Sequence, residues 1–214
     1  LSGRQFLVTA GPCREAIDPV RYISNRSSGK MGYALARAAA QRGADVTLVS
    51  GPTDLVVPSN VNYISVETTA QMSRAVLKHF ATADCLIMAA APADFTPSRP
   101  EKSKIKKSTA EISLELKPAV DILKEVSRVR RKGQRVVGFA LETDNDIANA
   151  RKKLSDKKLD LIVLNNPTRP GEGFSHDTNS VMLISPGKNR PVRLPLAPKD
   201  EIASQIVDVI AAML

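Results

Sequence analysis

The sequence predicts an α/β fold with a doubly wound, mostly parallel, Rossmann-like sheet and a β-rich flap. Short apolar runs alternate with helical patterns along most of the 214 residues, which is typical of this class. Apolar residues make up 43% of the chain but aromatic residues only 4%, so the core must be aliphatic, as in buried parallel strands. We place one domain at residues 1–214, a length that suits a single generous α/β unit.

Apolar runs predict strands at residues 5–10, 45–50, 61–66, 85–90, 135–140 and 159–165. The first helix is expected at residues 30–42, because this stretch is Ala-rich and Gly43 is a good helix stop. Two further helices are expected at residues 70–80 and 147–154. The tail predicts a hairpin over residues 179–194 around Pro186-Gly187, followed by a C-terminal helix from about Lys199.

One stretch breaks this alternation. Residues 91–107 hold three prolines, four lysines and an arginine, which predicts a long basic loop. Residues 111–117 alternate Ile112, Leu114 and Leu116 with polar neighbours, as a half-exposed strand does. Together they form the expected flap, at about residues 91–117.

The net charge of +9 favours polyanionic partners: nucleic acid, an anionic membrane surface or multiply phosphorylated small molecules. No apolar run approaches the ~20 residues of a membrane span. The first residues lack a Met and do not form a signal peptide, so we expect a domain excised from a longer chain. Cys13 and Cys85 are too few for a disulfide framework, which favours a reducing, cytoplasmic compartment. No metal cluster is expected around His79 or His176.

The loop after the first strand ends in Gly29 and Gly32, at the start of the first predicted helix. Small residues at a helix N-terminus let backbone N–H groups approach a phosphate, and Arg14, Arg21 and Lys30 add positive charge. The alternative is that the glycines serve only the turn.

Two common nucleotide motifs are absent from the sequence. GxGxxG does not occur, and the second strand ends in Ser50-Gly-Pro instead of the acidic residue that binds ribose in NAD enzymes. A P-loop is excluded because Met31 follows Gly29-Lys30. An NAD(P) oxidoreductase is therefore disfavoured.

A second candidate site follows the fourth predicted strand, in Ala89-Ala90-Ala91-Pro-Ala-Asp94-Phe95. Small side chains there would let a ring or a sugar approach the backbone, Asp94 could hold a divalent metal or a ribose, and Phe95 could stack. Lysines between Lys104 and Lys107 could neutralise charge in a transition state. Lys153 and Lys157, one helical turn apart, could bind a triphosphate. The alternative for both lysine groups is a solvated surface.

These segments together resemble bacterial phosphopantothenoylcysteine synthetases, which usually form the C-terminal half of a bifunctional flavoprotein. The most specific block runs from Asp18 to Gly32 as DPVRYISNRSSGKMG, and the resemblance extends over essentially the whole chain. Residues 104–107 and 138–143, Asn165 and Gly173-Phe174 fall in register with it. The resemblance implies a ligase that joins 4′-phosphopantothenate to L-cysteine through an acyl-cytidylate made from CTP.

The resemblance also implies roles for particular residues. Asn25 and Lys104 would be catalytic, and Arg21, Asn25 and Ala90 would bind the acid substrate. Mg²⁺ would bridge the nucleotide phosphates, with Asp94 as its candidate ligand. A homodimer would form through the flap strands near Lys104, and a flavin-dependent decarboxylase half would be fused to the domain. The implied nucleotide site comprises Ala89, Ala90, Asp94, Lys104, Pro118, Ala119, Val120, Phe139, Lys153 and Lys157.

The sequence departs from the family pattern at four positions. Cys13 stands where the family commonly has Thr, Ala119-Val120 replaces Asn-Pro, and Asn166 stands where Asp is expected. Two alternatives stay open: the same ligase using ATP, and a basic nucleic-acid-binding module. The second has little aromatic interleaving and no recognised binding motif, so we expect neither a nucleic-acid nor a membrane partner.

Overall fold

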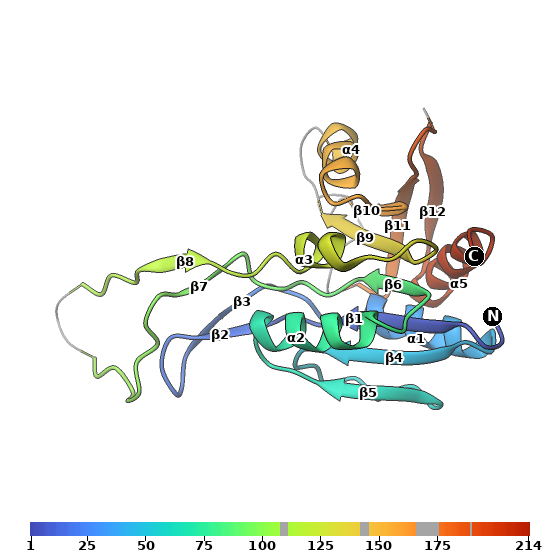
Figure 1. Cartoon of the computed structure of the whole chain (residues 1–214). Helices are drawn as coiled ribbons and strands as arrows, with labels where there is room; N and C mark the ends of the chain where they lie inside the picture. Colours follow the sequence, from blue (N-terminus) through green and yellow to red (C-terminus); the bar gives the residue numbers. More distant parts are fainter. Residues whose placement is uncertain (108–110, 142–145, 166–175, 189) are drawn as a thin grey trace.

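A central eight-stranded sheet organises the chain (Figure 1). The computed structural model describes residues 1–107, 111–141, 146–165, 176–188 and 190–214. Across the sheet the strand order is β12-β11-β10-β9-β6-β1-β4-β5. Their bounds are β1 Gln5–Ala10, β4 Asp45–Ser50, β5 Val61–Ser65, β6 Cys85–Met88, β9 Arg135–Leu141, β10 Leu161–Asn165, β11 Thr178–Ile184 and β12 Val192–Pro198.

Six neighbouring strands of this sheet, β5-β4-β1-β6-β9-β10, are parallel. Strands β11 and β12 add an antiparallel edge. Taken in chain order, the parallel strands have the 3-2-1-4-5-6 arrangement of the Rossmann fold, which confirms the predicted class. The order reverses between β1 and β6. Ligands of such sheets bind beside this point, outside the carboxyl ends of the strands.

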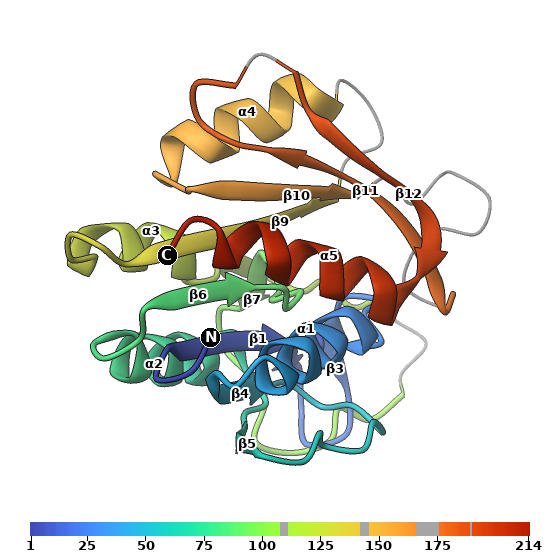
Figure 2. The ribbon, with the colours of Figure 1, turned by 90° about the vertical axis from the view of Figure 1, so that its right-hand side faces the viewer.

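Helices cover both faces of the sheet (Figure 2). On one face lie α1 (Lys30–Gln41) and α5 (Lys199–Ala211); on the other lie α2 (Thr69–Phe80), α3 (Ile122–Val129) and α4 (Asp146–Asp156). Each face has its own buried core, and both cores are largely aliphatic, as the composition predicts. None of the described helices is both long and apolar enough to cross a membrane.

Gly29 and Gly32 fix α1 against the carboxyl end of β1. A Cβ on Gly32 would lie 2.5 Å from Ala10 Cβ and 2.8 Å from Thr9 O, so only glycine permits this approach. Gly29 caps the helix with φ of 76°, in the left-handed region that favours glycine. The first turn of α1 therefore opens at the edge of the sheet where ligands bind.

Most predicted elements are confirmed, with ends that shift by up to two residues, except that the C-terminal hairpin extends to Pro198, four residues beyond its predicted end. Strands β1 and β4 have the predicted bounds, and β11 and β12 form the predicted C-terminal hairpin. Helix α3 was not predicted. Asp121 caps it by accepting a 3.0 Å hydrogen bond from Lys124 N, and Ile122, Leu123 and Val126 bury its apolar face.

An arm projects from the carboxyl side of the sheet (Figure 1). Its described residues are 13–25, 93–107 and 111–118, with the antiparallel pairs β2 (Arg14–Ala16) with β3 (Tyr22–Ser24), and β7 (Phe95–Pro97) with β8 (Leu116–Pro118). The predicted strand at 111–117 was largely wrong, because only residues 116–118 pair. The ladder ends at Ser98 N to Glu115 O, and among the described residues no strand lies beside 111–114.

Candidate functional site

Two adjoining pockets open at the carboxyl ends of the parallel strands. The α3–α4 pocket, of about 620 Å³, lies between the start of α3, the end of β6 and helix α4. The α1 pocket, of about 440 Å³, lies between the start of α1 and the ends of β6, β9, β10 and β11. Both volumes are typical of small-molecule sites. The wall that they share consists of Ala90, Pro92, Asp94, Phe139 and Lys153.

Eight of the ten predicted nucleotide residues line the α3–α4 pocket: Ala90, Asp94, Pro118, Ala119, Val120, Phe139, Lys153 and Lys157. Ala89 lines the α1 pocket instead, together with Asn25. Asn25 and Ala90, two of the residues predicted to bind the acid substrate, line the same pocket. Lys104 and Arg21 line neither pocket.

Backbone and amide hydrogen bonds hold the shared wall in place. Ala90 N donates to Thr9 Oγ1 at 3.1 Å, and Ala91 N donates to Gly11 O at 2.9 Å. Asn25 Nδ2 donates to Pro92 O at 2.8 Å. The segment that follows β6 is therefore tied to the end of β1 and to the loop before α1.

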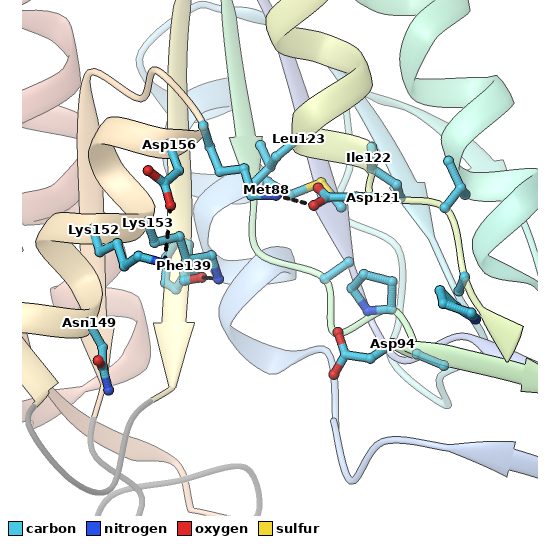
Figure 3. Close-up of a pocket in the computed structure, with 17 residues that line it drawn as sticks. Met88, Asp94, Asp121, Ile122, Leu123, Phe139, Asn149, Lys152, Lys153 and Asp156 are labelled. Carbon is cyan, nitrogen blue, oxygen red and sulfur yellow. Dashed lines mark hydrogen bonds and ion pairs between the residues drawn. The ribbon is translucent and has the colours of Figure 1, made fainter. Parts of the chain in front are cut away.

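Lysines of α4 supply the positive charge of the α3–α4 pocket (Figure 3). Lys153 Nζ donates to Phe139 O at 2.8 Å, and Lys157 Nζ donates to Asp121 Oδ2. The two lysines share one face, as their spacing predicted. Partial burial raises the pKa of Asp121, but hydrogen bonds from Lys157 Nζ and Lys124 N bring it below its ordinary value. Asp121 therefore stays ionised and holds Lys157 at the pocket.

Asp94 lies across the pocket from the α4 lysines (Figure 3). Its carboxylate is exposed and has no hydrogen-bond or ion-pair partner among the described residues. Within the same residues no three His, Cys, Asp or Glu side chains gather into a metal site. One free carboxylate fits the way in which Mg²⁺ binds, through one or two carboxylates together with substrate phosphates and waters.

The far end of the α1 pocket is also cationic. Lys30, the first residue of α1, forms a 2.6 Å ion pair with Asp177. Lys199, the first residue of α5, is 7% exposed and donates to His176 O. Burial lowers the pKa of Lys199, and the nearby charge of Lys30 lowers it further.

Arg21 and Lys104 lie together on the arm, beside the turn that closes the β2–β3 pair, and neither lines a pocket. Arg21 Nε donates to Asp18 Oδ2 at 3.0 Å, and its Nη2 donates to the carbonyl oxygen of Ile105, beside Lys104, at 2.7 Å. Ile105 N donates to the same Asp18 oxygen at 3.1 Å. The Arg21 guanidinium holds the pKa of the buried Asp18 carboxyl well below its usual range. Arg14 and Phe95 also lie on the arm and line neither pocket.

Neither cysteine has the environment of a nucleophile. Burial raises the pKa of the Cys13 thiol to about 11, and its Sγ lies 4.0 Å from the sulfur of Met72. Burial likewise raises the pKa of Cys85, which is fully buried in β6. Both thiols are free.

Several pocket residues were not predicted from the sequence. Asp121 and Lys152 belong to the α3–α4 pocket, and Asn179 and Lys199 belong to the α1 pocket. An N-cap pattern marks Asp121, but no local motif marks Asn179 or Lys199. Residues 142–143 and Gly173-Phe174, on which part of the resemblance rested, lie outside the described residues, and so does Asn166, one of the departures from the family pattern.

Known proteins resemble this chain over nearly its whole length. Residues 1–214 match the family described as DNA/pantothenate metabolism flavoprotein, C-terminal domain. The chain is 47% identical to the coenzyme A biosynthesis bifunctional protein CoaBC of Bacillus subtilis, across 100% of this chain and 52% of that protein. It is also 47% identical to a cysteine/cysteine sulfinic acid decarboxylase of an unknown prokaryotic organism, across 97% of this chain and 58% of that protein. The chain thus spans little more than half the length of these relatives.

One solved structure covers the same residues. It is the crystal structure of the C-terminal domain of a coenzyme A biosynthesis bifunctional protein CoaBC, with a TM-score of 0.85 and 39% identity. The match covers 100% of this chain and 96% of that one.

Proposed function

Because the chain belongs to the family of DNA/pantothenate metabolism flavoprotein C-terminal domains, we propose that it is a ligase joining 4′-phosphopantothenate to L-cysteine. The observation that carries the proposal is the shared wall of the two pockets. A nucleotide in the α3–α4 pocket and an acid in the α1 pocket would meet at Ala90, Asp94, Phe139 and Lys153. Similarity to a protein named for coenzyme A biosynthesis supports this substrate pair.

The first proposed step activates the acid with CTP. A carboxylate oxygen attacks the α-phosphorus, the bond from that phosphorus to the bridging oxygen breaks, and pyrophosphate leaves. This step brings anions together, so fixed positive charge lowers its barrier. Lys153 and Lys157 are held by Phe139 O and Asp121, which places their charge at the pocket before the nucleotide arrives.

In the second proposed step the cysteine amine attacks the acyl carbon. The bond between that carbon and the CMP oxygen breaks, and the nitrogen loses a proton. Asn25 lies at the acid side of the shared wall, where its amide can donate to developing negative charge without competing as a nucleophile.

Asp94 would hold Mg²⁺ at the nucleotide phosphates. When bound there, the ion would neutralise part of the negative charge of the triphosphate. Asp94 suits this role because its carboxylate faces the pocket and is not engaged by any described side chain.

The arm supports a proposed homodimer. Large apolar side chains are exposed along it, at Val20, Tyr22, Phe95, Ile112, Leu114 and Leu116. A projecting arm of two short antiparallel pairs with this surface gains from pairing with a second copy. Arg21 and Lys104 lie on the same arm and line neither pocket, so their proposed roles require an arm to reach a pocket.

Two further assignments are proposals of the same kind. The word bifunctional in the name of one relative, and the word decarboxylase in the name of another, support a companion decarboxylase half for domains like this one. Two free, buried thiols agree with the reducing cytoplasm as its compartment.

Pyrophosphate release tests the proposed function. The protein is incubated with Mg²⁺, CTP, 4′-phosphopantothenate and cysteine, and each component is omitted in turn. ATP replaces CTP in a parallel series. We expect release that requires both CTP and the acid, with cysteine needed for turnover and for the amide product.

Two outcomes would change the assignment. Release that is faster with ATP than with CTP would keep the ligase and overturn the nucleotide. No release with either nucleotide would overturn the ligase, and salt-dependent oligonucleotide titrations would then test the nucleic-acid alternative.

A further inference from the structure

Strand β1 buries one polar side chain within an apolar run. Thr9 is 0% exposed, and its buried neighbours in the strand are Phe6, Leu7, Val8 and Ala10. A buried hydroxyl is unfavourable unless hydrogen bonds satisfy it. Thr9 lines neither pocket of the candidate site, so it can act there only through the residues that it contacts.

The Thr9 hydroxyl has two partners, and both belong to the segment at the end of β6. Thr9 Oγ1 donates to Met88 Sδ at 3.2 Å and accepts from Ala90 N at 3.1 Å. Met88 lines the α3–α4 pocket (Figure 3), and Ala90 lies in the wall that the two pockets share. The single O–H donor of Thr9 and one of its lone pairs are therefore both used beside the site.

The hydrogen bond from Ala90 N fixes the orientation of the peptide between Ala89 and Ala90. None of the described peptide bonds is cis, and in a trans peptide the N–H and the C=O point in opposite directions. Because the Ala90 N–H points to Thr9, the Ala89 carbonyl points away from it. The methyl groups of Ala89 and Ala90 pack against the cores on opposite faces of the sheet. The backbone is therefore what these two residues offer to the pockets.

The Ala89 carbonyl is an unused acceptor at the α1 pocket, which Ala89 lines. The N–H of Ala89 donates to Ile87 O at 3.2 Å, whereas no described residue donates to Ala89 O. A carbonyl oxygen binds groups that carry hydrogen-bond donors, which ionised phosphates and carboxylates lack. Of the groups that react in the proposed function, only the attacking amine carries N–H donors.

We propose that Thr9 is a positioning residue whose hydroxyl turns the Ala89 carbonyl toward the α1 pocket, where this carbonyl accepts a hydrogen bond from the attacking amine. The inference rests on the proposed function and concerns its second step. An amine held through one N–H has a fixed orientation, so its lone pair can be aimed at the acyl carbon beside the shared wall. The carbonyl orients the amine and takes no proton from it.

Four variants isolate the hydroxyl. Thr9→Val keeps the shape of the side chain and removes both hydrogen bonds. Ala90 N then lacks its acceptor, and the cost of an unsatisfied amide favours rotation of the peptide, which turns the Ala89 carbonyl away from the pocket. Thr9→Ala removes the same hydroxyl, whereas Thr9→Ser keeps it and loses only a methyl group. Thr47→Val makes the same change on the neighbouring strand β4, outside both pockets, and is the matched control.

Single-turnover kinetics separate the two steps. The protein is first mixed with Mg²⁺, CTP and 4′-phosphopantothenate, and pyrophosphate release reports the activation step. Cysteine is then added, and rapid quench follows amide formation over a range of cysteine concentrations. In Thr9→Val we expect amide formation to slow about 10- to 100-fold, because a misplacement of about 1 Å can cost this much. Pyrophosphate release should remain close to the wild-type rate.

Rescue separates positioning from stability. Thr9→Ser should restore amide formation, and Thr47→Val should match wild type in both steps. Urea unfolding of each variant gives its stability. If Thr9 only stabilised the fold, the rate of amide formation would follow the unfolding midpoint. The proposed role instead makes Thr9→Ser active and Thr9→Val slow when their midpoints are equal.

Amide hydrogen exchange measures the peptide directly and needs no activity. The Ala90 N–H should exchange slowly in wild type and faster in Thr9→Val. Unchanged exchange at Ala90, equal slowing of both steps, or unaltered amide formation would overturn the positioning role. If Thr9→Val does not fold, Thr9→Ala decides on the same measurements. A wild-type protein that releases no pyrophosphate overturns the proposed function instead, and exchange at Ala90 then still decides whether the hydroxyl holds the peptide.

Discussion

Lys153 Nζ donates a 2.8 Å hydrogen bond to Phe139 O, and both residues line both pockets. Replacing Lys153 by Met removes one cation and leaves the helix intact. We expect the KM for CTP to rise about 10- to 100-fold, since a hydrogen bond to a charged group contributes roughly 1.5–3 kcal/mol. Pyrophosphate-release kinetics and nucleotide titration measure the effect. Lys132→Met is the control, because Lys132 is exposed in the turn before β9, at the opposite end of the sheet. Equal KM values in both variants would remove Lys153 from the nucleotide site.

Asn25→Asp tests the second proposed step. The carboxylate cannot donate to Pro92 O, and it adds negative charge where the acyl-phosphate anion forms. We expect amide formation to slow about 100-fold, the usual effect of losing one donor to a developing oxyanion. Acyl-nucleotide should then accumulate and be detected by mass spectrometry after acid quench. Asn62→Asp makes the same change on exposed β5 and should leave both steps unchanged. If both the activation step and amide formation were lost, Asn25 would be assigned to acid binding alone.

Cys13→Thr should retain activity within about twofold, because a surface-inaccessible thiol contributes no chemistry. The pKa of Cys13 is raised to about 11, so its thiolate is scarce until the pH exceeds that value. Alkylation by iodoacetamide in the native protein should stay slow from pH 7 to 9. In guanidinium chloride both cysteines should react at the rate of ordinary thiols, whose pKa is about 8.5. Rapid native labelling at Cys13 on intact-mass analysis would contradict the buried environment.

The sequence predicted the sheet because each strand has a local apolar pattern that its neighbours reinforce. β1 and β4 were placed to the residue, since both are short apolar runs between polar ends. The alternation at Ile112, Leu114 and Leu116 has the two-residue period of a β-strand. Pairing also needs a partner strand, however, and β7 extends only to Pro97. Alternation alone therefore could not place β8.

The candidate site could be predicted where its residues follow strands or share a helix turn. Ala90, Asp94 and Phe139 lie at or near strand ends, and Lys153 and Lys157 share a face. Asn179 and Lys199 could not be predicted, because the β11–β12 edge brings them to α1 from far along the chain. The ion pair between Lys30 and Asp177 spans 147 positions in the sequence, and no local pattern encodes such a contact.

Asp18→Asn should loosen the contact between the β2–β3 turn and Ile105 of the arm. It removes the charge that holds Arg21 and Ile105 N. Because the pKa of Asp18 is depressed in the folded state, the ionised contact is complete at pH above the ordinary value of about 4 and is lost only as the pH falls through the lower folded value. Trypsin cleavage within residues 102–107 at pH 8 should accelerate about tenfold. Asp54→Asn, in an exposed loop, is the control. Unchanged cleavage would mean that other contacts hold the arm.

Gly32→Ala tests whether close approach fixes α1 at the site. The new Cβ would lie 2.5 Å from Ala10 Cβ and 2.8 Å from Thr9 O, so the helix must move away from β1. Overpacking of this kind costs roughly 1–3 kcal/mol, which exceeds the gain of about 1 kcal/mol from replacing Gly by Ala in a helix. Urea unfolding should therefore show a lower midpoint with an unchanged slope.

A double variant separates the clash from the change in helix propensity. Ala10→Gly combined with Gly32→Ala removes the nearer of the two contacts, so part of the stability should return as a coupling between the positions. The displaced first turn lines the α1 pocket, so substrate binding measured by calorimetry should weaken in Gly32→Ala and recover in the double variant. A Gly32→Ala protein more stable than wild type would show that only helix propensity counts at this position. In that case the start of α1 would not owe its place at the pocket to this contact.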